Sequence, residues 1–310
     1  MSKSSNITSL DSFNETLESS VSDFPYKAPK HFINCIDTNN PDDPLLKQIQ
    51  ISDAELVETV GFANDPVADL DNNPQPSIIH KYHGRVLLIA SPKCDIHCRY
   101  CFRRHFPYSE HVSVRHWQKA MDYIKADKSL HEVILSGGDP MALNDHSFMA
   151  IIEQVENISH VKTIRVHSRT PVVAPDKAIG QPFLDWLENS RLKVVLVVHC
   201  NHANELSEQT QRLLSKYRKA GITLLNQSVL LKGVNDNTDV LADLSHKLFD
   251  QGVLPYYLNQ LDRVQGSAHF EVSDDKARQL HQALKSKLPG YLVPKLVKDI
   301  AGKGHKTNLN

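Results

Sequence analysis

The chain has 310 residues, of which 40% are hydrophobic and 23% are charged. These fractions are typical of a globular protein, and the length suffices for one large domain or a barrel-type domain with an extension. The 35 basic and 36 acidic residues leave a net charge of −1, so charge predicts neither a nucleic-acid nor a membrane partner. The sequence contains no run of about 18 apolar residues and no hydrophobic segment of a signal peptide after Met1, which favours a cytoplasmic protein.

The first part of the chain is rich in turn signals and poor in chemistry. Residues 1–25 are polar and favour a loosely ordered arm or short helix. Short helices are expected at 44–49 and 53–60, between Pro- and Asn-rich turns. We therefore interpret residues 1–80 as an N-terminal helical extension.

From Arg85 onwards, apolar strands alternate with amphipathic helices, which predicts a parallel sheet with right-handed crossovers. Six βα units are too few for a closed eight-stranded barrel. We expect an α/β fold, a partial (β/α)6 TIM-like barrel over residues 81–290, with a doubly wound sheet as the alternative and 291–310 as a C-terminal segment. The predicted strands are 85–90, 132–136, 161–167, 193–199, 222–228 and 253–259; the predicted helices are 113–127, 145–156, 178–189, 204–219, 237–250 and 273–287.

Three of the five cysteines follow the first predicted strand in a CxxxCxxC spacing: Cys94, Cys98 and Cys101. A structural zinc site needs a fourth ligand, and His97 lies in a crowded position within the same short loop. A 4Fe-4S cluster fits better, because three thiolates leave one iron open for chemistry. Three unligated cysteines remain the alternative. The other two cysteines are not expected to be ligands, and free thiols suit a reducing compartment.

Polar clusters follow every predicted strand, where the loops of parallel barrels carry their chemistry. After the cysteines these clusters are 136–140, 167–171, 199–202, 226–228 and 259–262. Each could be an ordinary turn. Together they predict one polar rim, in which Gly137 and Gly138 let the backbone approach a ligand closely.

The CxxxCxxC motif followed by Ser136-Gly137-Gly138-Asp139 resembles the signature of the radical S-adenosylmethionine (SAM) superfamily. The runs 98–106, 167–173, 226–236 and 288–295 are similar to the lysine 2,3-aminomutase family. Within that family, the phrases at 80–85 and 103–108 resemble a short bacterial branch that serves the β-lysylation of elongation factor P.

The resemblance implies three cofactors: a 4Fe-4S cluster, SAM and pyridoxal 5′-phosphate (PLP). It implies that Lys306 holds PLP covalently, with Lys303 as a competitor. It implies that Arg103 binds the substrate carboxylate and that Asp262 and Asp299 receive the ε-ammonium of lysine. The remaining implied contacts are Cys94, Cys98 and Cys101 with the cluster, Ser136, Gly137, Gly138, Asp139, His199 and Gln227 with SAM, and Arg85 near the PLP phosphate.

The reaction that the resemblance implies is conversion of (S)-α-lysine to (R)-β-lysine. It further implies an electron donor protein and a separate ligase that attaches the product to elongation factor P, and it leaves homo-oligomer formation open. One alternative is a free-standing lysine 2,3-aminomutase of lysine degradation or β-lysine synthesis. The other is a non-catalytic iron–sulfur or zinc protein that keeps the fold for binding.

Overall fold

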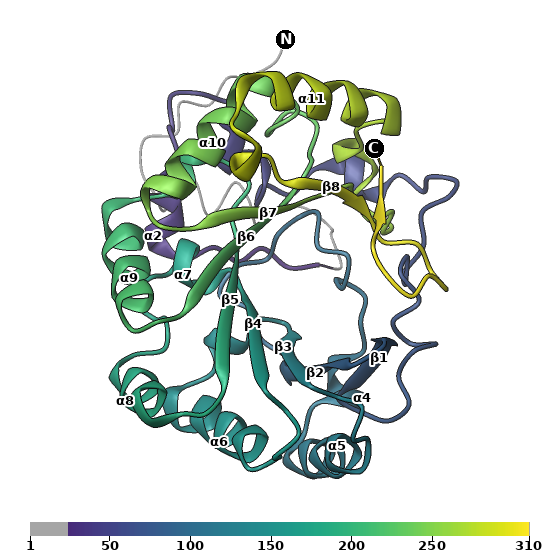
Figure 1. The fold of residues 1–310 in the computed structure, drawn as a ribbon. Helices are drawn as coiled ribbons and strands as arrows, with labels where there is room; N and C mark the ends of the chain where they lie inside the picture. Colours follow the sequence, from purple (N-terminus) through teal and green to yellow (C-terminus); the bar gives the residue numbers. More distant parts are fainter. Residues whose placement is uncertain (1–23, 310) are drawn as a thin grey trace.

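The computed structural model describes residues 24–309, and these contain a nine-stranded sheet whose strands lie side by side in the order of the sequence (Figure 1). Strands β2 to β8 are parallel, while β1 and β9 pair antiparallel at the two ends. The strands are β1 Ile78–Tyr82, β2 Arg85–Ser91, β3 Glu132–Gly137, β4 Thr163–Ser168, β5 Lys193–His199, β6 Thr223–Val229, β7 Leu254–Asn259, β8 Lys295–Lys298 and β9 Thr307–Asn308.

The strictly sequential strand order decides between the two predicted topologies. A doubly wound sheet reverses its strand order near the middle, and this sheet does not. Within residues 24–309, β1 and β9 do not pair, so the sheet stays open. The predicted α/β fold of the partial-barrel type is therefore confirmed.

A helix follows each of the six predicted strands and packs on the outer face of the curved sheet (Figure 1). Five of the six begin at an Asn or Ser whose side chain accepts a hydrogen bond from the first turn, as expected of N-caps. These helices are α5 Val114–Ala126, α6 Asp145–Glu156, α8 Gln181–Asn189, α9 Glu208–Lys219, α10 Thr238–Asp250 and α11 Asp274–Lys287. Shorter elements are α4 Tyr108–His111, α7 Thr170–Val173, η2 Pro140–Ala142, η3 Ala203–Glu205, η4 Ala268–Phe270 and η5 Gly290–Leu292.

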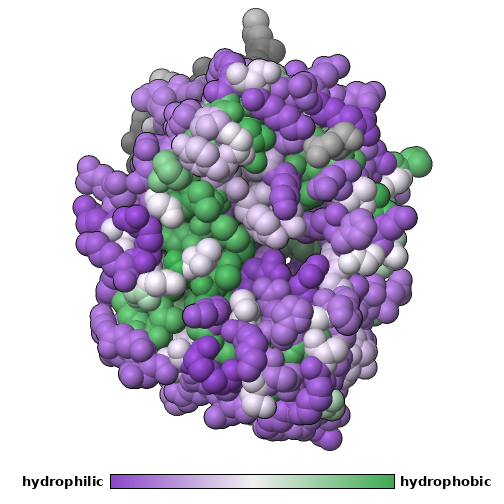
Figure 2. Space-filling view, in the orientation of Figure 1, coloured by the Kyte–Doolittle hydropathy of each residue, from purple (hydrophilic) through white to green (hydrophobic). Residues whose placement is uncertain are grey.

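Alternation along the strands separates the core from an inner cavity. In β4, Ile164 and Val166 are fully buried in the main hydrophobic cluster, whereas the alternating Arg165 and His167 border the cavity. Because successive side chains of a strand point to opposite faces, one face packs on helices and the other carries the polar groups. Figure 2 shows the outer surface in the same view, mostly hydrophilic with a hydrophobic area over β5 and β6.

Three strands escaped the sequence prediction. Strand β1 begins in the segment interpreted as an extension and crosses its boundary at residue 80, and β8 and β9 fall after residue 290. The last two have only four and two residues, too few for a periodic pattern. They join the sheet by pairing with β7 and with each other, and Leu309 N donates to Leu296 O at 3.1 Å. The C-terminal segment is thus an integral edge of the sheet.

The N-terminal segment packs against the barrel through α2 Lys30–Ile33, α3 Pro44–Lys47 and the 3₁₀ turn η1 Asp53–Leu56. The predicted helix at 53–60 is therefore a single turn. Its Glu55 is buried and accepts hydrogen bonds from Arg99 at 2.8 Å and from Arg104 at 2.6 Å. Residues 1–23 of the predicted arm lie outside the described residues. No helix within 24–309 is both long and apolar enough to cross a membrane.

Candidate active site

One cavity of about 730 Å³ lies on the inner face of the sheet. Cavities that hold a single drug-sized ligand measure roughly 300–1,000 Å³. Every site residue expected from the sequence borders this cavity: Arg85, Cys94, Cys98, Cys101, Arg103, Ser136, Gly137, Gly138, Asp139, His199, Gln227, Asp262, Asp299 and Lys306. The structure thus brings together side chains that are up to 221 positions apart, counting from Arg85 to Lys306.

The cysteine loop leaves the carboxyl end of β2, and all three of its thiols are half-buried at the cavity wall. Burial raises the pKa of Cys94 well above its usual value, and burial beside Cys98 raises the pKa of Cys101 to about 11. Cys94 and Cys101 therefore keep their protons unless an electron-poor metal centre binds them, which is how thiolate ligands form. The three-thiol donor set fits an iron–sulfur cluster.

His97 does not join the thiols. Its Nδ1 lies 2.8 Å from the carbonyl oxygen of Pro25, and its ring stacks on Phe24 at 4.9 Å between centroids. It is also not among the residues that border the cavity. The zinc alternative, which needs His97 as the fourth ligand, gains no support from this placement.

The two glycines at the end of β3, Gly137 and Gly138, allow the cysteine loop to pack closely against this strand end. A Cβ at Gly137, which has a φ of +118°, would lie 2.7 Å from Ser91 O, and one at Gly138 would lie 2.5 Å from Lys93 O. The same segments are joined by hydrogen bonds from Gly138 N to Ser91 O at 2.8 Å and from Asp139 N to Lys93 O at 2.7 Å. The absence of side chains here is thus needed for loop packing, a reason that the sequence did not reveal.

Asp139 joins the β3 loop to the β4 loop. Its carboxylate accepts hydrogen bonds from Ser168 Oγ at 2.6 Å and from the backbone N–H groups of Arg169 at 2.7 Å, Thr170 at 2.9 Å and Met141 at 2.9 Å. Burial raises the pKa of this carboxyl despite those four donors. Both oxygens are therefore occupied by the protein, and Asp139 shapes the wall of the cavity rather than offering a free acceptor to it.

Arg103, two residues after the last cysteine, is held by a buried ion pair. Its Nε lies 2.7 Å from Asp69, which also pairs with Lys81 at 2.6 Å. Burial alone would raise the pKa of Asp69, but the two cations outweigh burial and lower it. Arg103 Nη1 donates to Ser136 Oγ at 3.3 Å, and its Nη2 makes no hydrogen bond within residues 24–309. The guanidinium is thus fixed in orientation with donors left for a ligand.

At the sheet edge formed by β8 and β9, the ammonium group of Lys306 contacts one carboxylate and lies near a second. Lys306 Nζ lies 3.3 Å from Asp299 Oδ2, which also accepts a hydrogen bond from the Tyr82 hydroxyl at 3.2 Å. Burial raises the pKa of Asp262 to about 6, although the nearby charge of Lys306 opposes this shift. No hydrogen bond to the Asp262 carboxylate is found within residues 24–309. This corner of the cavity accommodates an alkylammonium and keeps one carboxyl unpaired.

The β4, β5 and β6 strands contribute neutral rings and an amide to the wall. His199 Nε2 lies 2.8 Å from Gln227 Nε2, and burial with nearby cations lowers the pKa of His199 to about 3. His167 Nε2 is buried without a hydrogen-bond partner among the described residues. Elsewhere in the cavity lining, the Arg85 guanidinium of β2 stacks over the Tyr82 ring of β1 at 4.7 Å. The wall formed by His167, His199 and Gln227 offers hydrogen-bonding groups without anionic charge.

The sequence profile of the Radical SAM superfamily matches residues 88–244, from β2 into α10. An L-lysine 2,3-aminomutase of Escherichia coli (strain K12) is 48% identical over 288 residues, covering 93% of this chain and 84% of the relative. One from Haemophilus influenzae is 47% identical, covering 92% and 84%. The chain belongs to the lysine 2,3-aminomutase family of radical SAM isomerases.

A more distant relative agrees with this membership, and a solved structure shares the fold. The L-lysine 2,3-aminomutase of Clostridium subterminale is 36% identical over 279 residues, covering 89% of this chain and 67% of the relative. The crystal structure of Streptococcus suis SuiB superposes with a TM-score of 0.53 at 12% identity, over 72% of this chain and 50% of that chain. The latter likeness concerns the fold alone.

Several residues that border the cavity were not predicted from the sequence. Asp69 lies in a turn-rich segment that no motif marks, and the phrase at 80–85, which contains Lys81, assigned that lysine no role at the site. Arg165 and Glu132 form a two-point ion pair at 2.8 and 3.1 Å on the cavity wall. Arg169 lies in a cluster that the sequence did mark, but its partners come from loops that no local pattern connects.

Proposed function

We propose that the chain is a radical SAM, PLP-dependent lysine 2,3-aminomutase that converts (S)-α-lysine to (R)-β-lysine. The observation that carries this proposal is the corner where Lys306 Nζ contacts Asp299 and lies near Asp262, in the same cavity as three clustered thiols. One end of the cavity suits a metal cluster and the other suits an alkylammonium. The residues of both border the same cavity.

When bound, the cluster with SAM supplies a radical that removes a substrate hydrogen, and PLP supplies delocalisation for the migrating nitrogen. Cys94, Cys98 and Cys101 are the residues that would hold the cluster. Ser136, the backbone at 137–139, His199 and Gln227 border the adjoining space, where SAM would bind. Because the pKa of His199 is low, its ring contributes a neutral hydrogen-bonding group.

Lys306 has two properties that suit a lysine that holds PLP. It stands on the short link into β9, so the sheet edge fixes its backbone, and its Nζ is directed at Asp299. Lys303 is exposed and outside the cavity lining, which favours Lys306 over this competitor. Arg85 supplies a cation for the phosphate.

The substrate would be held at its two ends by the chain's own charges. Arg103, oriented by Asp69, presents free guanidinium donors to the α-carboxylate. Asp262 and Asp299 receive the ε-ammonium once Lys306 is engaged by PLP, so that one cation replaces another. Such an exchange avoids leaving two carboxylates buried without a cation.

We further propose that the product serves the β-lysylation of elongation factor P in the cytoplasm. Support comes from the branch-like phrases at 80–85 and 103–108 and from the match over 84% of the Escherichia coli relative. The partners would be a reducing protein and the ligase that consumes β-lysine. Comparing the mass of elongation factor P in cells with and without the gene tests this role. Loss of one lysyl mass in the deletion is expected; an unchanged mass would favour the free-standing enzyme.

The catalytic proposal is tested with anaerobically reconstituted, reduced protein supplied with SAM, PLP and L-lysine. Formation of β-lysine by the wild type and its loss in Lys306→Ala are expected. Metal analysis provides a second readout that does not depend on turnover. Zinc in place of iron, or the absorbance of an imine between PLP and the protein that survives in Lys306→Ala, would overturn the proposal.

A further inference from the structure

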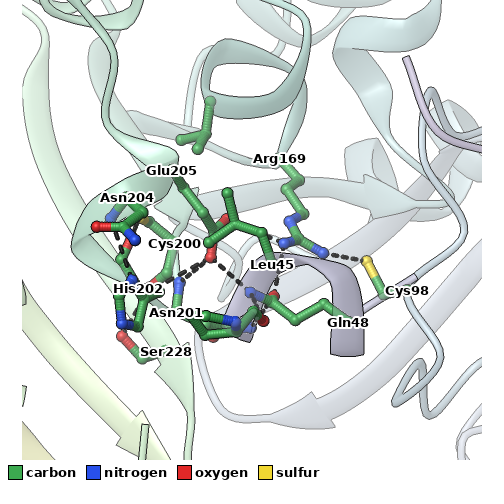
Figure 3. Close-up of polar contacts among 12 residues, drawn as sticks. Leu45, Gln48, Cys98, Arg169, Cys200, Asn201, His202, Asn204, Glu205 and Ser228 are labelled. Carbon is green, nitrogen blue, oxygen red and sulfur yellow. Dashed lines mark hydrogen bonds and ion pairs between the residues drawn. The ribbon is translucent and has the colours of Figure 1, made fainter. Parts of the chain in front are cut away.

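A buried polar network links the N-terminal segment to the cysteine loop (Figure 3). At its centre is Gln48, which follows α3 and is fully buried. Its Oε1 accepts hydrogen bonds from Arg169 Nη2 at 2.8 Å and from Asn201 Nδ2 at 3.0 Å, and its Nε2 donates to Glu205 Oε1 at 3.0 Å. Burying a side-chain amide costs free energy unless its N–H and C=O groups form hydrogen bonds. Gln48 meets this requirement through Arg169, Asn201 and Glu205.

The network orients the Arg169 guanidinium toward the Cys98 sulfur. Arg169 Nη1 donates to Cys98 Sγ at 2.6 Å, while its Nη2 is shared between Gln48 and Glu205 Oε2 at 2.9 Å. Figure 3 shows the guanidinium between the cysteine on one side and the glutamate on the other. Arg169 is only 5% exposed and Glu205 1%. The Arg169 side chain is therefore largely buried and held from behind by Glu205 and Gln48, while the half-buried Cys98 sulfur that it contacts borders the cavity.

Glu205 is itself held in place. Its Oε1 also accepts hydrogen bonds from the backbone N–H groups of Asn201 and His202, each at 3.0 Å. The carboxylate thus belongs to the loop after β5, and Gln48 to the N-terminal segment. Two separate parts of the chain therefore hold Arg169, which contacts the cysteine loop.

We propose that Gln48 and Glu205 are positioning residues that hold Arg169 against Cys98 and thereby set the reduction potential of the bound cluster. This proposal rests on the proposed function, because it requires a cluster on the three cysteines. Hydrogen bonds to ligand sulfurs and nearby charge are established determinants of cluster potentials. The Arg169 cation and its N–H favour the reduced, more negative cluster, and the Glu205 anion opposes it. The N-terminal segment therefore takes part in tuning electron transfer.

This arrangement predicts shifts of opposite sign. Arg169→Gln removes the cation, so the equilibrium constant for reduction falls at least tenfold, which is about 59 mV for one electron. Glu205→Gln removes the anion and keeps the side-chain shape, so the potential rises. Gln48→Leu removes one acceptor that holds the guanidinium, so the potential falls, but by less than in Arg169→Gln.

The test is a spectroelectrochemical titration of the reconstituted cluster, without SAM, PLP or lysine, followed by electron paramagnetic resonance. Gln251→Leu is the matched control, because Gln251 is a buried glutamine at the end of α10 and does not border the cavity; its potential should equal that of the wild type. If the wild type forms no 4Fe-4S cluster, the proposed function itself fails. If the cluster forms, potentials that stay unchanged in the three variants, or that shift together in one direction, overturn the tuning role alone. Should Arg169→Gln lose its cluster, the signs in Glu205→Gln and Gln48→Leu decide.

Discussion

Asp262 should give lysine binding a pH dependence that an asparagine removes. Burial raises the pKa of this carboxyl to about 6 in the free protein. An ammonium ligand binds the ionised carboxylate, so below that pH the site must first lose a proton. The side chain has no hydrogen bond within residues 24–309 that Asp262→Asn would break, which makes the substitution a clean removal of charge.

The magnitude follows from linkage. Each pH unit below the pKa costs about 1.4 kcal/mol of binding free energy, so lysine affinity at pH 5 should be about tenfold weaker than its plateau above pH 7. In Asp262→Asn this slope should be absent. At neutral pH the variant should bind lysine about 10- to 150-fold more weakly, since hydrogen bonds to charged groups contribute roughly 1.5–3 kcal/mol.

The assay is titration of lysine into the unreduced holoenzyme between pH 5 and pH 8, with SAM cleavage by the reduced protein measured in parallel. Asp275→Asn, whose side chain is 88% exposed on α11, is the control and should resemble the wild type. Cleavage of SAM should be largely intact in Asp262→Asn. A slope that persists in Asp262→Asn, or an equal loss of SAM cleavage, would refute this explanation and make Asp262 a structural residue.

Three further predictions concern the cofactors and the stability of the fold. Cys94→Ser should abolish the iron content and visible absorbance of the reconstituted cluster, whereas Cys200→Ser, at a buried position away from the cavity, should retain both. Lys306→Ala should lose reducible covalent PLP and Lys303→Ala should keep it, as measured by borohydride trapping and peptide mass analysis; the reverse result would assign the role to Lys303. Burial alone would raise the pKa of Glu55, but hydrogen bonds from its two arginines outweigh burial and lower it. Glu55→Gln should therefore destabilise the protein by about 3–5 kcal/mol near pH 7 in denaturant titrations, and the difference should shrink as the pH falls below about 4; a loss that is the same at both pH values would contradict the ion-pair explanation.

The elements that the sequence predicted are those whose signal is local. Strand β5, for example, is a seven-residue run with five apolar positions, and its burial is visible in the letters themselves. Strands β8 and β9 carry no such signal, because their burial depends on pairing with β7 and on packing beside α11. Their positions are decided by partners that lie elsewhere in the chain.

The site residues also divide into those with a local sequence signal and those without one. The cysteine spacing and the polar residues at the strand ends are short-range patterns, and the parallel topology alone gathers them at one rim. Gln48 and Glu205 contact each other across 157 positions, and neither belongs to a motif. No sequence pattern indicates the role of Asp69 either, since an aspartate in a turn-rich segment is common. Contacts that hold a site residue in place depend on tertiary packing, and no local sequence pattern indicates them.

The most direct test of the proposed chemistry follows the nitrogen atom. Reduced holoenzyme is incubated with SAM and lysine labelled with ¹⁵N at the α-amino group, and the product is analysed by NMR and mass spectrometry. An aminomutase predicts β-lysine in which the labelled nitrogen is bonded to C3 and none of the label is lost. Product without the label, or label that remains on C2 while SAM is consumed, would contradict the proposed function.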